Sequence, residues 1–243
     1  MDAAYTHLAD WFEYLNADCD YEKWSQYLHK KLLGAGVAAG RGLDLGCGSG
    51  RFTRMLSRMG YGMTGIDASG EMLAAAARMS AEEGIYPQFA QCDVRGLKIP
   101  GKADFAVSVN DCFNYVPPAD IPRAFAHVKN CLKKGGVFLF DVSSEYKIRQ
   151  VLGNNSFCED REDVACMWFC RQTAEGVEME VTLFIKRADG LFERREERHV
   201  QYAHGSGFLR SALESAGFEV LSEEGALGDA QDKMRVNFLC RRR

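Results

Sequence analysis

Short apolar runs and segments with helical spacing alternate through much of the chain. Strand-like runs lie at 43–45, 61–66, 88–91, 104–109 and 137–142, and helical patterns lie between them at 51–59, 69–79 and 120–132. Ser69 and Asp120 are suited to cap the last two of these helices. Strands that alternate with helices predict a parallel, doubly wound sheet. Because crossovers between parallel strands are right-handed, the carboxyl ends of the strands share one edge, where a ligand is expected to bind.

The segments before and after this pattern complete the predicted fold. Residues 5–33 have helical spacing with a break at 16–18, and three antiparallel strands are predicted at 164–171, 178–187 and 191–202, with a hairpin turn at 188–190. A helix at 207–215 and strands at 218–222 and 236–240 resume the first pattern. We therefore predict an α/β protein with a mostly parallel, seven-stranded sheet. Its core is 1–160 and 204–243, with 1–36 as a helical lid or flank and 161–203 as a small antiparallel β insertion.

Composition and charge narrow the classes of function. The 243 residues are 47% hydrophobic and 26% charged, as in ordinary globular proteins. A net charge of −4 and a pI of about 5.8 argue against a general nucleic-acid-binding surface, and the arginines at 241–243 are interpreted as a solvated tail. The chain shows no signal peptide and no apolar run of membrane-spanning length. Its nine cysteines form no C-x-x-C pair, and we interpret them as small buried residues of a cytoplasmic protein.

A glycine-rich loop follows the first strand, with the sequence Gly46-Cys47-Gly48-Ser49-Gly50. Such a loop also binds NAD and FAD, so by itself it is weak support for any ligand. Two residues argue against a dinucleotide. Arg51 stands where the dinucleotide pattern has its last glycine, and Asp44 would repel a pyrophosphate. A cationic ligand with an ammonium group would instead be attracted by Asp44.

The run Leu43-Asp44-Leu45-Gly46-Cys47-Gly48-Ser49-Gly50 resembles motif I of the class I S-adenosylmethionine-dependent methyltransferases. The likeness continues at Gly65-Ile66-Asp67, Cys92-Asp93-Val94 and Leu132-Lys133-Lys134-Gly135-Gly136, and so covers nearly the whole chain. It is most similar to small bacterial methyltransferases with a strand insertion after the fifth strand. The resemblance implies a Rossmann-like fold, S-adenosyl-L-methionine as cofactor and methyl transfer as the activity.

Residues at the strand ends have physical roles that suit this donor. Glycines let the backbone turn close to a ligand, and the following helix N-terminus favours the donor carboxylate. Asp44 is expected to reach the donor ammonium, Asp67 both ribose hydroxyls and Asp93 the adenine amino group, with Met72 packed on the adenine face. The expected donor-binding residues are Asp44, Gly46, Cys47, Gly48, Gly50, Asp67, Ala68, Met72, Cys92, Asp93, Val94 and Asn110.

The acceptor side is expected after the fourth strand, at 110–115. Because an in-line displacement mainly requires alignment, no catalytic residue is obligatory. The candidates to orient the acceptor or to act on its proton are Asp111, Asn114, Tyr115 and His199. We expect Cys112 to be a small buried residue, and a role as catalytic nucleophile is the weaker alternative. No set of histidine, cysteine and carboxylate residues has the spacing of a metal site. Pro117-Pro118 comes after Tyr115, the reverse of the order in enzymes that methylate adenine N6 or glutamine N5, and this disfavours those substrates.

The identity of the acceptor stays open at this point. We expect a small molecule, with RNA as an alternative through a patch of Lys129, Lys133, Lys134 and the arginine tail. Alternatives of a different class are an NAD-type oxidoreductase and a non-catalytic adenosylmethionine-binding protein. The protein is expected to be a monomer or a homodimer.

Two expectations concern segments outside the sheet. The aromatic residues Tyr5, Tyr14, Trp24 and Tyr27 suggest that the N-terminal segment closes over the donor, and the alternative is that they bury against the sheet. The insertion is expected to roof the acceptor pocket. Its apolar face at 179–185 needs a partner, either its own domain or the same sheet of a second subunit.

Overall fold

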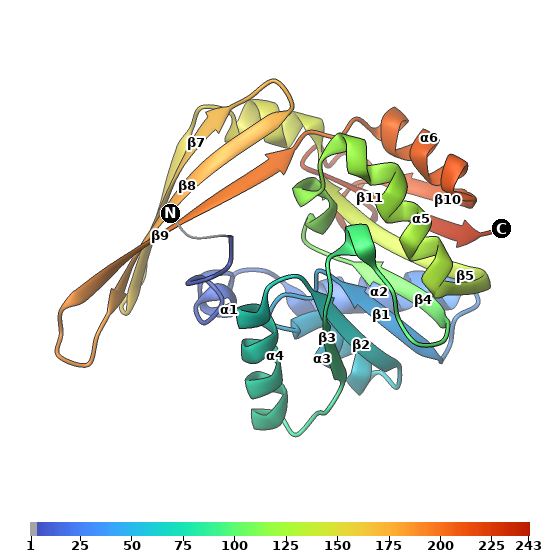
Figure 1. Ribbon diagram of the computed structural model, residues 1–243, viewed down its shortest axis with the longest axis horizontal. Coiled ribbons are helices and arrows are strands. Elements are labelled where there is room, and N and C mark those ends of the chain that lie inside the picture. Colours follow the sequence, from blue (N-terminus) through green and yellow to red (C-terminus); the bar gives the residue numbers. More distant parts are fainter. Residues whose placement is uncertain (1–3) are drawn as a thin grey trace.

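The computed structural model describes residues 4–243, so residues 1–3 of the predicted lid or flank lie outside the described residues. The larger of two sheets has seven strands in the order β10-β11-β5-β4-β1-β2-β3 (Figure 1). Only β11 runs antiparallel to its neighbours, β5 and β10. The predicted mostly parallel seven-stranded sheet is therefore confirmed. Its strands are β1 (Arg41–Leu45), β2 (Gly62–Asp67), β3 (Gln88–Gln91), β4 (Ala103–Ser108), β5 (Leu132–Ser143), β10 (Phe218–Glu224) and β11 (Arg235–Arg242).

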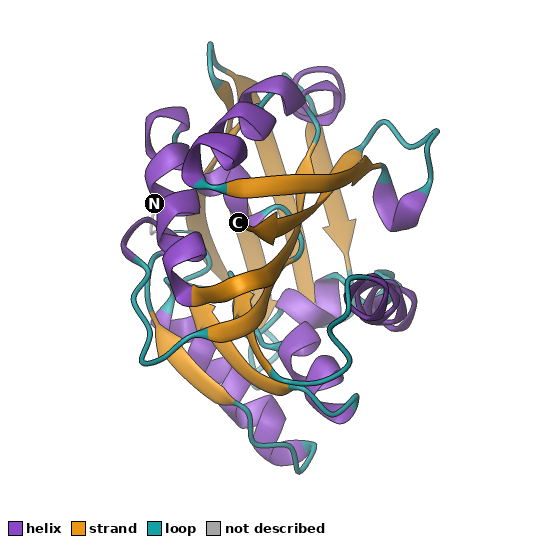
Figure 2. Cartoon of the chain, turned by 90° about the vertical axis from the view of Figure 1, so that its right-hand side faces the viewer, coloured by secondary structure: helices purple, strands orange, loops and turns teal. Residues whose placement is uncertain are grey.

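Helices cover both faces of this sheet, as a doubly wound fold requires (Figure 2). The α-helices are α1 (Phe12–Leu15), α2 (Tyr21–Gly34), α3 (Arg51–Arg58), α4 (Gly70–Glu82), α5 (Ile121–Cys131) and α6 (Ser206–Ala216). Short helical turns are η1 (Val94–Gly96), η2 (Cys112–Tyr115), η3 (Pro118–Asp120), η4 (Lys147–Leu152) and η5 (Ala226–Gly228). One buried cluster joins the sheet to α5 and α6, and a second joins it to α2 and α3.

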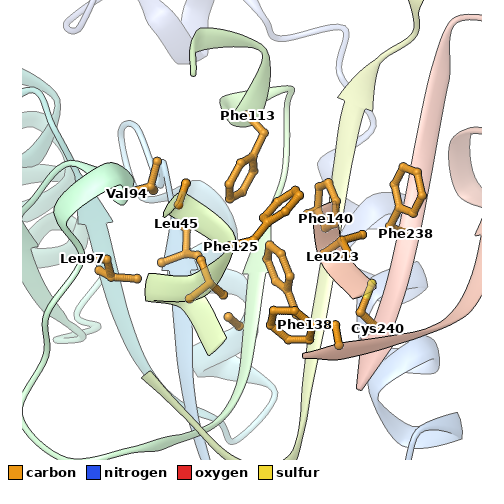
Figure 3. Close-up of a cluster of buried hydrophobic side chains, with 14 of the residues drawn as sticks. Leu45, Val94, Leu97, Phe113, Phe125, Phe138, Phe140, Leu213, Phe238 and Cys240 are labelled. Atoms are coloured by element: carbon orange, nitrogen blue, oxygen red, sulfur yellow. The ribbon is translucent and has the colours of Figure 1, made fainter. Parts of the chain in front are cut away.

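Aromatic packing anchors the segment after β4 to the core. The ring of Phe113, in η2, lies 5.2 Å from that of Phe125 and 5.3 Å from that of Phe140 (Figure 3). Phe138 and Phe140 stack with their centroids 4.6 Å apart. Because all four rings are buried, they hold η2 firmly against the carboxyl end of β5.

The predicted helix caps have different outcomes. The Ser69 side chain accepts the backbone N–H of Met72 at 3.1 Å, as predicted for the start of α4. The prediction for Asp120 is wrong, because its side chain makes no capping hydrogen bond. The carboxylate pairs instead with two guanidinium groups, one on each oxygen, namely those of Arg123 at 2.9 Å and Arg95 at 3.7 Å.

A second sheet of four antiparallel strands follows η4, in the order β6-β7-β8-β9. The strands are β6 (Ser156–Asp160), β7 (Val164–Gln172), β8 (Gly176–Lys186) and β9 (Phe192–Tyr202). The hairpin turn predicted at 188–190 joins β8 and β9. The sheet has one strand more than the three predicted and begins at Ser156. β6 is short and mostly polar, and Phe157 alone stacks on a neighbouring ring, that of Trp168 at 5.5 Å, so its sequence carries little strand signal.

The N-terminal segment covers the apolar face of this second sheet. Leu15 is buried in one cluster with Met179, Val181 and Leu183 of β8, and Leu8 and Trp11 pack against it. Figure 1 shows α1 beside the second sheet, on the side of the core. The apolar face at 179–185 thus finds its partner within the same chain.

The C-terminal arginines are not a free tail. Arg241 donates to the carbonyl of Ala35 at 3.1 Å, and Arg242 donates to the carbonyls of Lys129 at 3.0 Å and Leu132. These carbonyls lie where α2 and α5 end, so the two guanidinium groups cap helix C-termini. No helix within residues 4–243 is both long and apolar enough to cross a membrane.

Candidate active site

A cavity of about 240 Å³ lies at the carboxyl edge of the large sheet. The loops after β1, β2, β3 and β4 line it, together with residues of the N-terminal segment. Eleven of the twelve predicted donor-binding residues are on its walls, namely Asp44, Gly46, Cys47, Gly48, Asp67, Ala68, Met72, Cys92, Asp93, Val94 and Asn110. The twelfth, Gly50, is not among the lining residues.

The glycine loop needs its glycines for backbone conformation and for space. Gly46, Gly48 and Gly50 have φ angles of +69°, +54° and +78°, in the left-handed region that side chains disfavour. A Cβ on Gly46 would lie 2.4 Å from the Sγ of Cys112, and one on Gly50 would lie 3.0 Å from the Cβ of Ala76. Gly50 therefore serves the turn into α3 and its packing, while Gly46 and Gly48 form the cavity wall.

Asp67 ties two loops of the cavity together. Its carboxylate accepts the backbone N–H of Gly48 at 2.8 Å and that of Ser69 at 2.9 Å. Burial raises the pKa of Asp67, although these hydrogen bonds act against the rise. Each oxygen of an ionised carboxylate accepts more than one hydrogen bond, so Asp67 can still receive donors from a ligand.

Asp44 is the most deeply buried acid of the cavity, with 2% of its surface exposed. The Thr53 hydroxyl donates to it at 2.5 Å. Burial, together with the nearby Asp67, raises the pKa of Asp44 to about 7. Among residues 4–243, no lysine or arginine forms an ion pair with either acid. The buried Asp44 and the half-buried Asp67, without a cation, make this part of the cavity suited to a cationic ligand.

Asp93 has a different environment. Its carboxylate accepts the backbone N–H of Arg95 at 2.8 Å and its Nε at 2.9 Å. Hydrogen bonds from Arg95 hold the pKa of Asp93 below its usual range. Sequence reasoning missed Arg95, which also lines the cavity and neutralises the acid predicted to receive the adenine amino group.

The segment after β4 splits between the cavity and the protein interior. Asn110 and Asp111 both have positive φ, +63° and +56°, a conformation that Asn and Asp adopt more readily than other non-glycine residues. Asn110 lines the cavity, whereas Asp111 does not. The Asp111 carboxylate accepts from Gln201 at 2.8 Å and pairs with Arg235 at 3.3 Å. Burial opposes ionisation, but the charges of Arg235 and Lys147 hold the pKa of Asp111 low.

Asn114 is fully buried and ties η2 to two strands. Its amide donates to the carbonyls of Ser143 at 3.0 Å and Tyr202 at 2.9 Å, and its oxygen accepts the N–H of Ser143 at 2.9 Å. The side chain does not line the cavity, and these bonds occupy both of its ends. Its position therefore fits a structural role.

Tyr115 lines the cavity and begins a chain of hydrogen bonds that runs away from it. Its hydroxyl lies 2.9 Å from the Tyr5 hydroxyl and 3.2 Å from Nδ1 of His199. Nε2 of His199 lies 3.0 Å from a carboxylate oxygen of Glu197, which has no exposed surface. The His199 side chain therefore reaches the cavity through a hydrogen bond to Tyr115, and its ring also packs against that of Tyr5.

Comparisons with known proteins are consistent with this site. The family described as "Methyltransferase domain" matches residues 43–136. Two relatives are named "Putative methyltransferase". One, from Geobacillus sp. (strain WCH70), is 31% identical over 89% of this chain and 90% of its own length. The other, from Bacillus subtilis (strain 168), is 29% identical over 89% and 87%. A crystal structure of an S-adenosylmethionine-dependent methyltransferase from Clostridium acetobutylicum ATCC 824 has a TM-score of 0.87 and 30% identity, covering 96% of each chain.

The chain belongs to the class I S-adenosylmethionine-dependent methyltransferases. The sugar N-methyltransferase KedS8 from Streptoalloteichus sp. ATCC 53650 shares its fold, with a TM-score of 0.81, 18% identity, and 96% of this chain and 92% of that chain covered. S-adenosylmethionine is accordingly the cofactor of this methyltransferase, and the dinucleotide alternative falls away. The unpaired carboxyl groups of Asp44 and Asp67 fit a donor that carries an ammonium, a sulfonium and two ribose hydroxyls.

The aromatic residues of the methyltransferase's N-terminal segment divide between two roles. Tyr5 lines the cavity, as do Phe12 and Tyr21, which sequence reasoning did not single out. Trp24 and Tyr27 are buried in the core beside α3, and Tyr14 is 41% exposed. Tyr5 is thus placed where a lid would act, Trp24 and Tyr27 are buried as the alternative expected, and Tyr14 fits neither expectation. Closure of the segment over the donor stays a prediction.

The insertion of the methyltransferase lies behind the cavity. None of the lining residues found within 4–243 comes from 161–203, so the expected roof is wrong as a description of the cavity wall. Sequence reasoning missed Glu197, which belongs to a charged run that looked solvated. The alternation of Glu197, His199 and Gln201 along β9 places all three on one face and was the available signal.

Cysteines are more prominent in the cavity than expected. Cys47, Cys92 and Cys112 all line it, and only four of the nine cysteines are buried, namely Cys131, Cys166, Cys170 and Cys240. Burial raises the pKa of the Cys112 thiol well above its usual value. A protonated thiol is a poor nucleophile, which disfavours the alternative of covalent catalysis by Cys112.

Proposed function

We propose that this methyltransferase moves the methyl group of S-adenosylmethionine to a hydroxyl or amino group of a small molecule. The observation that carries the proposal is the continuity of one cavity from the donor residues to Tyr5 and Tyr115 beneath the N-terminal segment. A covered cavity suits a small acceptor better than a polymer. The fold shared with a sugar N-methyltransferase supports the same class of acceptor.

Residues after the first three parallel strands would hold the donor. Asp44 faces the ammonium group, Asp67 the ribose hydroxyls, and Asp93 with Val94 the adenine edge, while Met72 packs against the ring. The N-terminus of α3 favours the carboxylate. When bound, the donor supplies a methyl group on a positively charged sulfur, which is a good leaving group. The protein then has to align the acceptor and exclude water, a task that suits the enclosed Asn110 and Tyr115.

RNA is a less suitable acceptor because the basic residues lie elsewhere. Lys133 and Lys134 begin β5, at the edge of the sheet opposite the cavity. Lys133 pairs with Asp104 at 2.7 Å, and the guanidinium groups of Arg241 and Arg242 cap helices. These charges offer no track that leads into the site.

The test uses donor labelled in its methyl group. The protein is incubated with a low-molecular-mass metabolite fraction and, separately, with total RNA. We expect label in one or a few small molecules and none in RNA. Label in RNA alone, or donor binding without any transfer, would overturn the proposal.

A further inference from the structure

Four side chains from three distant segments form one continuous chain of hydrogen bonds at the acceptor side of the cavity. Tyr5 comes from the N-terminal segment, Tyr115 from η2, and His199 and Glu197 from β9. Resting on the proposed function, we infer that Tyr115, His199 and Glu197 form a proton relay that deprotonates the acceptor, and that the N-terminal segment completes it by closing.

The hydrogen-bonding roles of the three side chains determine the direction in which a proton moves along the relay. Glu197 is ionised and can only accept, because hydrogen bonds from His199 and from the backbone of the N-terminal segment hold its pKa low in spite of burial. Nε2 of His199 therefore carries the hydrogen that lies between the two residues. In the neutral ring Nδ1 is then an acceptor, and the Tyr115 hydroxyl donates to it across 3.2 Å.

In this arrangement the Tyr115 oxygen accepts the hydrogen of the Tyr5 hydroxyl at 2.9 Å, and its second lone pair is the one that can take a proton from the cavity. As the acceptor attacks the methyl carbon, its proton passes to the Tyr115 oxygen and the Tyr115 proton passes to Nδ1 of His199. The new bond to carbon forms while the carbon–sulfur bond of the donor breaks, and that electron pair stays on sulfur. The products are the methylated acceptor, the neutral thioether and an imidazolium beside Glu197. Burial raises the pKa of Tyr115, so its phenol stays neutral and passes the proton on to His199 instead of becoming a charged phenolate.

The carboxylate that orients His199 also holds the N-terminal segment in place. Glu197 accepts the backbone N–H groups of Tyr5 at 2.8 Å, Leu8 at 2.7 Å and His7. Tyr5 adopts a φ of +63°, and its ring lies 4.9 Å from the His199 ring. Closing this segment thus covers the cavity and sets the Tyr5 hydroxyl against Tyr115 in one movement. Glu197 is a positioning residue in this scheme, and Tyr115 is the residue that touches the acceptor.

A second histidine–tyrosine pair offers a matched comparison. Nδ1 of His29 lies 2.9 Å from the Tyr61 hydroxyl, but among residues 4–243 no carboxylate forms a hydrogen bond or ion pair with His29, and neither residue lines the donor cavity. His29→Gln removes the same kind of hydrogen bond without touching the proposed relay.

The rate test compares Tyr115→Phe, His199→Gln and His29→Gln, with methyl-labelled donor and a metabolite fraction that the wild type labels. We expect Tyr115→Phe and His199→Gln to lose about 10²–10⁴-fold in transfer rate, the usual contribution of general base catalysis, with unchanged donor affinity by calorimetry. Glu197→Gln keeps the size of the side chain but removes the anionic partner of the imidazolium, so it should also lower the transfer rate while donor affinity stays unchanged.

A spectroscopic test does not depend on the acceptor. Nitrogen-15 NMR of the histidine rings, assigned with His199→Gln, should show neutral His199 protonated at Nε2. The Nδ1-protonated form would overturn the relay. So would wild-type rates in both Tyr115→Phe and His199→Gln, and that outcome would leave the proposed function standing. A wild type that binds donor yet labels no metabolite would overturn the proposed function and the relay with it.

Discussion

The donor half and the acceptor half of the cavity are built in different ways. The donor half comes from 44–94, where each loop directly follows a parallel strand and backbone bonds fix it, as when the carbonyl of Ile66 accepts the N–H of Gly46 at 2.7 Å. The acceptor half is assembled from the N-terminal segment and η2, supported from behind by β9. Donor recognition is therefore a local property of the sheet edge, whereas acceptor recognition depends on segments that meet only in the folded protein.

The two halves also rely on different interactions. Backbone turns at glycine shape the first. Buried networks of side-chain hydrogen bonds hold the acceptor half in place, and such a network loses several hydrogen bonds when one of its residues is replaced. Four substitutions or conditions probe this contrast, in order of decreasing expected effect.

Arg54 joins the two halves and should give the largest effect. It is fully buried on α3 and donates to the carbonyl of Ser49 in the donor loop at 2.7 Å and to Glu13 in α1 at 2.8 Å. Arg54→Leu leaves the Ser49 carbonyl without this donor and removes the closest cation from Glu13, which keeps the Ser49 hydroxyl at 2.6 Å. We therefore expect a loss of roughly 3–5 kcal/mol in the free energy of unfolding, measured with urea.

The matched control is Arg58→Leu. Arg58 pairs with Glu83 at 2.9 Å, but its side chain is 53% exposed. An exposed pair of this kind contributes about 0–1 kcal/mol, so this variant should be almost as stable as the wild type. Equal losses in the two variants would show that Arg54 does not join the halves.

Gly46 lies where the halves touch, and Gly46→Ala tests that contact. The new Cβ would meet Cys112 at 2.4 Å in a left-handed backbone conformation. Overpacking and backbone strain together should weaken donor binding by about 2–4 kcal/mol in calorimetry. Adding Cys112→Ala should restore only part of the affinity, because it removes the sulfur but leaves the Cβ of residue 112 at 2.7 Å from the new side chain. Gly60→Ala, with a φ of +94° and no atom within 4 Å of the new Cβ, should leave donor affinity unchanged. If Gly60→Ala weakened binding as much, the contact with Cys112 would not be the cause.

The donor half was easier to predict from the sequence than the acceptor half, because it depends on the local ends of the strands. Asp44, Asp67 and Asp93 each lie at or just after the end of an apolar run, so strand periodicity alone placed them at one edge. Asp111 was predicted to orient the acceptor, but positive φ angles at two successive non-glycine residues turn it toward Arg235. No local pattern announces that turn.

Burial by a distant segment was equally hidden from the sequence. Glu197 belongs to a run of charged residues that is typical of a solvated strand face. Only the packing of Leu8 and Trp11 against the second sheet brings the N-terminal backbone over this carboxylate. Sequence periodicity identified β9 and the face that carries His199, but it could not show which segment covers that face.

Asp67→Ala should have the next largest effect on donor binding. The substitution removes the acceptor of the Gly48 and Ser69 N–H groups as well as the proposed contact with the ribose. We expect affinity to fall by roughly 1–3 kcal/mol in calorimetry, because a buried charged acceptor is lost. Asp93→Ala should cost less, since Arg95 already neutralises that carboxylate. Asp104→Ala, which removes a carboxylate at the opposite edge, should change nothing, and a similar loss there would point to a general charge effect.

The smallest predicted effect is a pH dependence of donor binding through Asp44. The pKa of this carboxyl is raised to about 7, so it loses its negative charge as the pH falls through neutrality. A cationic donor prefers the ionised form, and its affinity should therefore fall by up to about tenfold per pH unit below that value. Donor affinity should be measured from about pH 7.5 downward, because at higher pH the α-amino group of the donor loses its own proton, as α-amino groups do at about 7.7–8.0.

The raised pKa of Asp44 also determines how the stability of the donor-free protein changes with pH. The folded protein binds the Asp44 proton near pH 7 and the unfolded chain binds it only near about pH 3.9, so folding is favoured by protonation in between. This contribution to stability decreases as the pH rises from about 4 to about 7 and is constant above. Asp44→Asn should remove both this slope and the pH dependence of donor affinity. Because Asp67 also has a raised pKa, a dependence that persisted unchanged in Asp44→Asn would assign the effect to Asp67 and leave Asp44 as a structural partner of Thr53.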